Sequence, residues 1–267
     1  MVPARLKRAL RPLADRVAPR WTERRRFLWL LEAHKQAARE LVRRNGLKVS
    51  GGPFAGMTYP ERAVERADQL NGASKLLGSY ELELEEIVRR VEPGAYRHVI
   101  NIGCAEGYYA VGLALRLPDA HVHAFDSDET ARSLCREAAL ANGVADRISV
   151  GAECAVDELR SLPVAGALIV CDCEGCEGEL LEPALVPGLA ESDILVELHD
   201  WFVDGVSERV TERFRSTHDV TRIRPRDRDP DAFPAVAQLD AELRPLAVSE
   251  FKPREGIEWA WMTRRRG

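Results

Sequence analysis

Short apolar segments that alternate with helical patterns constrain the fold of this 267-residue chain more than any other feature. We expect strands at 98–102, 121–125, 148–151, 167–171, 194–198, 219–224 and 257–262. Helical patterns lie between the early strands at 107–117, 129–142 and 176–189. Near-continuous apolar strands separated by helices are typical of a mostly parallel sheet with helices on both faces. The sequence therefore predicts an α/β fold.

The residues before the first strand read as a helical extension. A pattern of apolar positions at helical spacing runs from about residue 4 to 45 and ends at Gly46, a residue typical of helix C-termini. A loop or small hairpin at 47–60 and a second helical pattern at 74–95 follow. We expect a leader extension at 1–80 and a sheet domain at 81–267, with an insertion at 226–255 before the last strand.

The charge of the chain is unevenly distributed. The net charge is −5, yet residues 1–44 contain 13 Lys and Arg against 4 Asp and Glu. A basic arm of this kind can bind nucleic acid. We favour instead an amphipathic helix that packs on an acidic body, because Trp21, Phe27 and Trp29 recur at helical spacing with leucines.

Targeting signals and a disulfide framework are absent from the sequence pattern. No window approaches the roughly 18 apolar residues of a membrane span, and the arginine-rich N-terminus has no apolar signal core. The six cysteines lack the spacing of a disulfide scaffold, which predicts free thiols and a cytoplasmic location. Cys171, Cys173 and Cys176 could supply zinc ligands, but apolar packing near the sheet is the favoured interpretation.

A glycine turn follows the first strand, and an acid follows the second. Gly103 and Gly107 precede a helix, which indicates that the backbone approaches a ligand closely. Glu106 at that helix start would repel a pyrophosphate, so a cationic or zwitterionic ligand fits better. Asp126 can accept two hydrogen bonds from a ribose diol, while Asp128 can cap the next helix. Together these features predict a nucleoside-binding site.

Residues 98–200 resemble the core of class I S-adenosylmethionine-dependent methyltransferases. "VINIGCAEG" resembles the first motif of that family, "HAFDSD" the second, and "LIVCDCEGCE" the strand-4 motif of its FkbM-like branch. The leader segments "GPFAGMTY" and "LLGSYELEL" resemble relatives in the same branch, so the resemblance extends over about 50–265. It implies a Rossmann-like, seven-stranded, mostly parallel sheet with S-adenosylmethionine as cofactor.

The resemblance also implies which residues hold the cofactor. These are Tyr80, Glu81, Asn101, Gly103, Gly107, Asp126, Glu153 and Asp172. The two glycines would hold the methionine part, Asp126 the ribose, and Glu153 would lie near the adenine. Asn101 stands where the family often has an acid, and would contact the amino group. Tyr80 and Glu81 would close over the cofactor, although a solvated helix with exposed glutamates explains that leader segment equally well.

Polar residues at two neighbouring strand ends are the candidates for chemistry. Methyl transfer requires an aligned acceptor and, for a hydroxyl, removal of its proton. We expect His199 to be the general base, Asp172 to position cofactor or acceptor, and Glu174 to take part in catalysis. A structural role for the histidine is the alternative. A divalent metal on Asp172, Glu197, His199 and Asp200 is possible but not favoured.

The sequence thus predicts O-methylation of a small-molecule hydroxyl, on a specialised metabolite or a sugar-like acceptor. The segments 50–80 and 226–255 would shape the acceptor site. A nucleic-acid methyltransferase that uses the basic arm is less favoured, since the chain lacks an Asn-Pro-Pro-Tyr-like motif. A non-catalytic module that keeps the cofactor pocket is a further alternative. No membrane partner is expected, and a homodimer is left open.

Overall fold

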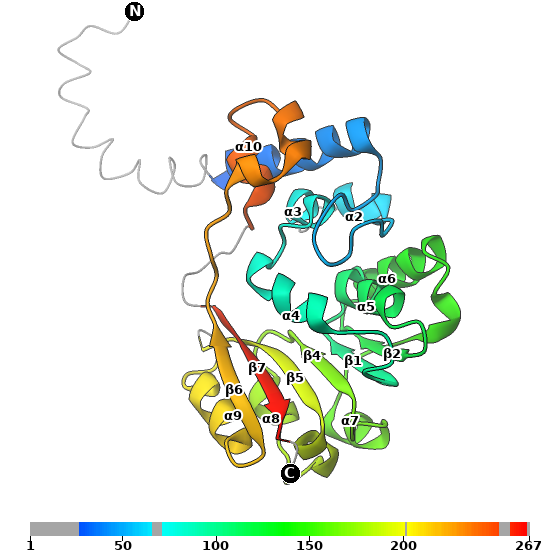
Figure 1. Cartoon of the computed structure of the whole chain (residues 1–267), viewed down its shortest axis with the longest axis vertical. Coiled ribbons are helices and arrows are strands. Elements are labelled where there is room, and N and C mark those ends of the chain that lie inside the picture. The colour runs from blue at the N-terminus through cyan, green and yellow to red at the C-terminus, as the bar shows by residue number, and fades with distance from the viewer. Residues whose placement is uncertain (1–26, 66–70, 201, 251–256, 266–267) are drawn as a thin grey trace, which may run out of the picture.

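The computed structural model describes residues 27–65, 71–200, 202–250 and 257–265. Within them, a seven-stranded sheet has the order β3-β2-β1-β4-β5-β7-β6 (Figure 1). Its strands are β1 His98–Ile102, β2 His121–Phe125, β3 Ile148–Gly151, β4 Leu168–Cys171, β5 Asp193–Leu198, β6 His218–Ile223 and β7 Glu258–Arg264. Strands β1 to β5 pair in parallel, and β7 is antiparallel to both neighbours. The predicted fold class is confirmed, and each strand lies within two residues of its predicted bounds.

The register of the sheet brings the candidate residues to one edge. In the parallel pairing, Ile102 at the end of β1 lies opposite Phe125 of β2 and Cys171 of β4. The next residue of each strand is therefore Gly103, Asp126 or Asp172. The chain runs outward from β1 to β3 and then crosses to β4, so strand order reverses between β1 and β4. Ligands of open α/β sheets bind at such a point.

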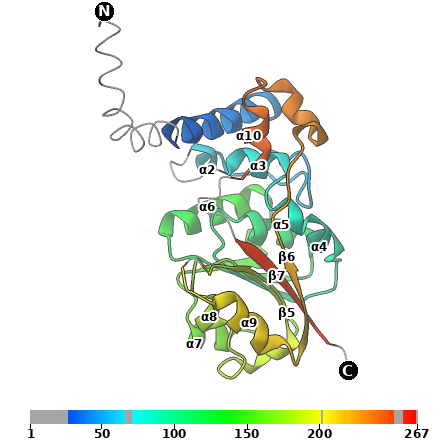
Figure 2. The ribbon, with the colours of Figure 1, turned by 90° about the vertical axis from the view of Figure 1, so that its left-hand side faces the viewer.

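Helices cover both faces of the sheet, as Figure 2 shows. Helices α5 Tyr108–Arg116 and α6 Glu129–Ala141 lie on one face, and α7 Val156–Ser161, α8 Glu177–Leu180 and α9 Val206–Phe214 lie on the other. Successive strand residues such as Val99 and Ile100 belong to separate hydrophobic clusters, because side chains alternate across a sheet. The helix expected at 176–189 is wrong in length: α8 is short, and Pro183 and Pro187 interrupt the continuation.

The leader and the insertion form a layer beyond the carboxyl ends of the strands (Figure 1). The leader contributes a helix at 27–45, α2 Glu61–Glu65 and α3 Gly72–Leu77, and a 3-10 turn η1 Leu82–Leu84 and α4 Glu85–Arg90 then connect this layer to the sheet. The insertion contributes η4 Pro230–Ala232, η5 Pro234–Gln238 and α10 Arg244–Val248. One continuous core joins this layer to the sheet, from Leu41 and Val248 to Val99. The domain division at residue 80 stays a prediction.

The expected leader helices are confirmed only in part. The helix at 27–45 ends at Gly46, whose φ is +72°, but the pattern at 74–95 is broken at Gly78, with φ +77°. Phe27 and Trp29 are about half exposed, at 47% and 54%, so the expected packing of these aromatic side chains stays a prediction. Trp21 lies outside the described residues. Among the helices described, none has the length and apolarity needed to cross a bilayer.

Candidate functional site

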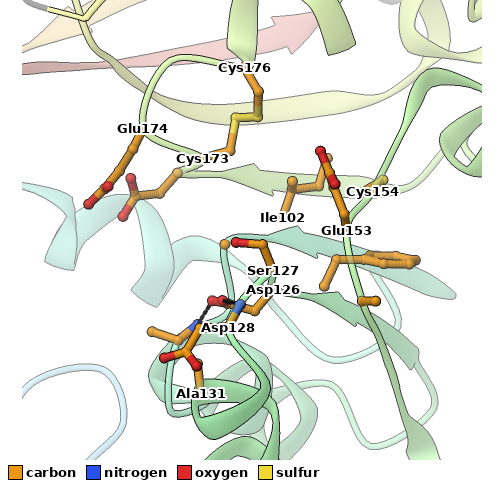
Figure 3. A pocket seen from close by; sticks show the side chains of 15 residues that line it. Ile102, Asp126, Ser127, Asp128, Ala131, Glu153, Cys154, Cys173, Glu174 and Cys176 are labelled. Carbon is orange, nitrogen blue, oxygen red and sulfur yellow. Dashed lines mark hydrogen bonds between the residues drawn. A yellow bond between two sulfur atoms is a disulfide. The ribbon is translucent and has the colours of Figure 1, made fainter.

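A cavity of about 450 Å³ lies at the carboxyl ends of β1, β2 and β4 (Figure 3). Among the residues that line it are the predicted site residues Gly103, Asp126, Glu153, Asp172 and Glu174. Figure 3 shows Asp126 on one side of the cavity, with Glu153 and Glu174 on other sides. With Asp128, five acidic side chains line the cavity, and its described lining contains no Lys, Arg or His. Such a cavity favours a ligand that carries positive charge.

Contacts within the protein explain the two glycines of the turn. A Cβ on Gly103, whose φ is +79°, would lie 1.7 Å from the carbonyl oxygen of Asp172. A Cβ on Gly107 would lie 3.0 Å from the Sγ of Cys135 on α6. Both glycines therefore allow β4 and α6 to approach the turn, and their contact with a ligand stays a prediction. Gly103 lines the cavity as well, whereas Gly107 does not.

Asp126 connects the second strand to the glycine turn. Its Oδ2 accepts the backbone N–H of Ala105 at 2.8 Å, and its Oδ1 accepts that of Asp128 at 2.9 Å. A carboxylate oxygen has two lone pairs, so each keeps one for a ligand hydroxyl. Asp128 accepts from the N–H of Thr130 and caps α6, as the sequence predicts. Two backbone N–H groups thus orient the carboxylate that is predicted to hold the ribose.

Backbone strain is concentrated around this edge of the sheet. Among the described non-glycine residues, Glu81, Ala105 and Glu174 have positive φ, at +46°, +46° and +52°. Two of them line the cavity, and Glu81 belongs to the leader segment beyond the strand ends. Left-handed backbone costs energy for residues with a Cβ and persists where the surrounding structure enforces it, often at functional sites.

The segment between α3 and α4 brings acidic groups near Asp172, whose pKa the charge of Glu81 helps to raise. Glu81 is buried, accepts the hydroxyl of Tyr109, and its backbone N–H donates to Glu250 at 2.8 Å. Arg228 of the insertion bridges Glu83 and Glu250. The alternative of a solvated leader helix is therefore wrong for Glu81 and Glu83, whose burial depends on the insertion.

Tyr80 and Asn101 lie near the site without lining the cavity. Burial, and then the neighbouring carboxylates of Glu81 and Asp172, raise the pKa of Tyr80 well above its usual value. Asn101 is buried in β1 and donates to the carbonyl of Val170 at 3.3 Å. Its Oδ1 is buried and has no hydrogen-bond partner among the described residues. Contacts of these residues, and of Glu81, with a cofactor stay a prediction.

Glu106 does not act as the sequence argument assumes. Its side chain is fully buried, forms an ion pair with Lys75, and accepts the hydroxyl of Tyr59 at 2.9 Å. The partners neutralise the charge that would repel a pyrophosphate, so that part of the argument is corrected. The acidic lining of the cavity now carries the preference for a cationic ligand.

A compact cluster of polar side chains forms where β4 and β5 end. In register, Asp172 and Glu197 are the next pair after Cys171 and Val196. The Nε2 of His199 lies 3.2 Å from Oε2 of Glu197 and 3.6 Å from Oδ1 of Asp172. Its Nδ1 is 2.7 Å from Oε1 of Glu177, which was not singled out from the sequence although it ends the "DCEGCE" motif. Asp172 is 31% exposed and joins the cluster to the cavity.

The carboxylates change how these groups titrate. Burial would lower the pKa of His199, but hydrogen bonds with Glu177 and Glu197 raise it to about 10. Burial, followed by the charges of Glu197 and Glu81, raises the pKa of Asp172 well above its usual value. A general base acts through the neutral imidazole, so the role expected of His199 requires it to release this proton first and stays a prediction.

Two other predicted contributions differ in the structure. Asp200 accepts the backbone N–H of Ser207, in the first turn of α9, at 2.9 Å. It is not a member of the cluster. Cys173 and Cys176 form a disulfide, which corrects the expectation of free thiols and removes two zinc ligands. Cys104, Cys135, Cys154 and Cys171 are free and buried.

The leader and the insertion meet around a second cavity of about 780 Å³. Residues from 45–52 and 77–85 line one side, and residues from 226–238 line the other. These segments include the two to which the sequence assigned acceptor recognition. None of the described residues lines both cavities, and a role for the second one in acceptor binding stays a prediction.

No family model matches the chain, and no curated protein matches it. Similar solved structures include precorrin 8w decarboxylase of Methanobacterium thermoautotrophicum, which is 19% identical with a TM-score of 0.45 over 68% of this chain and 89% of that one. Precorrin-6y C5,15-methyltransferase of Geobacter metallireducens is 10% identical, with a TM-score of 0.45, and the match covers 78% of this chain and 93% of that one. An O-methyltransferase of Bacillus cereus in complex with SAH is 16% identical, with a TM-score of 0.40, and the match covers 71% of this chain and 80% of that one. The likeness includes methyltransferases but identifies no substrate, and the FkbM-like branch stays a prediction.

Proposed function

We propose that this chain is an S-adenosylmethionine-dependent methyltransferase that acts on a hydroxyl group of a small molecule. The observation that carries the proposal is the acidic cavity at the point where strand order reverses, with Asp126 at the end of β2. S-adenosylmethionine has a sulfonium and an ammonium group, which suit five carboxylates. A dinucleotide would place a pyrophosphate among them without any basic side chain in the described lining.

The residues of the cavity fit different parts of this cofactor. Asp126 would hold the ribose through its remaining lone pairs, and Glu153 would lie toward the adenine. Gly103 and Asp172 would contact the methionine part, while Gly107 supports the turn from behind. The buried Glu81 offers a further carboxylate to the ammonium group. When bound, the cofactor supplies an electrophilic methyl group.

The acceptor has to approach from the side of Asp172. Of the cluster residues, Asp172 has a side chain 31% exposed, whereas those of Glu197 and His199 are 8% and 4% exposed. The acceptor oxygen would form a bond to the methyl carbon as the carbon–sulfur bond breaks, and the hydroxyl proton leaves to solvent. The protein aligns the two reactants and activates the hydroxyl at the cluster.

Cofactor binding and methyl transfer test this proposal separately. Asp126→Ala should weaken S-adenosylmethionine binding by about 1–3 kcal/mol, since it removes charge-assisted hydrogen bonds to the ribose. Calorimetry measures this against Asp146→Asn, an exposed carboxylate near the opposite end of the sheet. Transfer of labelled methyl groups to a panel of small hydroxyl compounds then tests the reaction. Transfer to nucleic acid alone would support the alternative in which the basic arm recruits the substrate.

A further inference from the structure

The cluster at the ends of β4 and β5 has the donor atoms and spacing of a cation site. Asp172, Glu197 and His199 each offer one ligand atom, and these atoms lie within 4.8 Å of one another. Metal bonds of about 2.1 Å place neighbouring ligands of an octahedron about 3.0 Å apart and opposite ones about 4.2 Å apart. The distances of 3.2 and 3.6 Å from Nε2 of His199 to the two carboxylates are close to the neighbouring separation.

A fourth residue orients the histidine in the way that metal sites require. Glu177 is fully buried and accepts from Nδ1 of His199 at 2.7 Å. A cation that displaces the proton of Nε2 leaves the proton on Nδ1 with Glu177, and the lone pair of Nε2 then faces Asp172 and Glu197. The backbone N–H of Gly175 donates to both oxygens of Glu177, at 3.2 and 3.1 Å, and so fixes the carboxylate itself. A carboxylate behind a ligating histidine is the usual outer contact of a protein-bound metal.

We propose that Asp172, Glu197 and His199 bind one divalent cation of the Mn²⁺ class, with Glu177 as the positioning residue. Two carboxylates and one imidazole form a mixed oxygen and nitrogen donor set. Mn²⁺ accepts such a set, whereas Mg²⁺ is typically bound by oxygen ligands alone. The proposal rests on the proposed function for its role. Three protein ligands leave open positions toward the cavity that Asp172 lines, where an acceptor hydroxyl can bind the cation and lose its proton more easily.

Manganese binding to the full chain tests the site without any cofactor or acceptor. The electron paramagnetic resonance signal of free Mn²⁺ should fall as the wild type binds one ion per chain. Asp172→Asn and His199→Ala should each weaken binding at least about tenfold, and Glu177→Gln by about 10–100-fold. Asp200→Asn is the matched control, because that strand-end carboxylate contacts Ser207 rather than the cluster, and it should bind Mn²⁺ like the wild type.

Two results would overturn the proposal. One is a wild-type chain that leaves millimolar Mn²⁺ free, a result that does not depend on how any variant folds. The other is binding that persists unchanged in folded Glu177→Gln and His199→Ala. S-adenosylmethionine binding in the presence of a chelator separates this inference from the proposed function. Cofactor binding without Mn²⁺ binding rejects only the cation site, and Mn²⁺ binding without cofactor binding rejects the proposed function.

Discussion

The buried ion pair between Lys75 and Glu106 makes the stability of the fold depend on one contact between the leader and the glycine turn. The side chains are 6% and 0% exposed, and Glu106 also accepts the hydroxyl of Tyr59. In Lys75→Met the carboxylate stays buried with a single neutral donor. Removing one partner of a buried pair costs about 3–5 kcal/mol, because the remaining charge is desolvated and uncompensated. We expect a loss of this size in the free energy of unfolding.

A double-mutant cycle distinguishes this mechanism from a loss of packing. Glu106→Gln alone leaves the ammonium of Lys75 buried and should also be strongly destabilising. The combination of both changes removes both charges, and should recover most of the stability lost in either single variant. Urea unfolding followed by circular dichroism measures all four proteins. Arg90→Met is the control, because its ion pair with Glu86 is 76% exposed on both sides and should contribute less than about 1 kcal/mol.

The reasoning would be refuted if Lys75→Met cost no more than the exposed control. It would also be refuted if the losses of the two single variants simply added in the double variant. In the first case the ammonium does not compensate the carboxylate. In the second, the residues stabilise the fold independently, and the leader is not tied to the turn by charge.

Three further predictions concern the glycine turn, a helix cap and the histidines of the sheet. Gly103→Ala should lower the melting temperature far more than Gly46→Ala: both have left-handed backbone, costing about 1–2 kcal/mol, but only the first would place a Cβ against backbone. Asp128→Ala should reduce the free energy of unfolding by about 1 kcal/mol in denaturant titrations, since it removes the cap of α6. Burial and then the nearby histidines lower the pKa of His123 from 6.5 to about 4. The unfolded chain therefore binds this proton first, stability should fall as the pH decreases from about 6.5 to 4, and His123→Gln should flatten that part of the profile.

The elements that a local pattern determines are the ones that could be predicted from the sequence. Each strand is a short apolar run, and parallel pairing places the residues after Ile102 and Cys171 at one edge. Gly103, Asp126 and Asp172 could therefore be assigned to one site before any coordinates. The alternation of Glu197 and His199 along β5 likewise placed them on one face.

Contacts between distant segments could not be predicted in the same way. Lys75 meets Glu106 across 31 residues, and Arg228 meets Glu83 across 145. A charged residue in a helical pattern reads as solvated unless its partner is known, which is why the sequence could not reject a solvated helix for Glu81 and Glu83. The titration of His199 depends on Glu177, 22 residues away, and a sequence does not show that a carboxylate will lie behind the ring.

The central claim is that the acidic cavity selects S-adenosylmethionine over ligands that carry a pyrophosphate. Calorimetric titration of the full chain with S-adenosylmethionine, and separately with NAD⁺, tests it directly. The account predicts saturable one-site binding of S-adenosylmethionine that Asp126→Ala weakens, and no measurable binding of NAD⁺. Binding of NAD⁺ with no heat from S-adenosylmethionine at high micromolar concentration would contradict both the charge argument and the function derived from it.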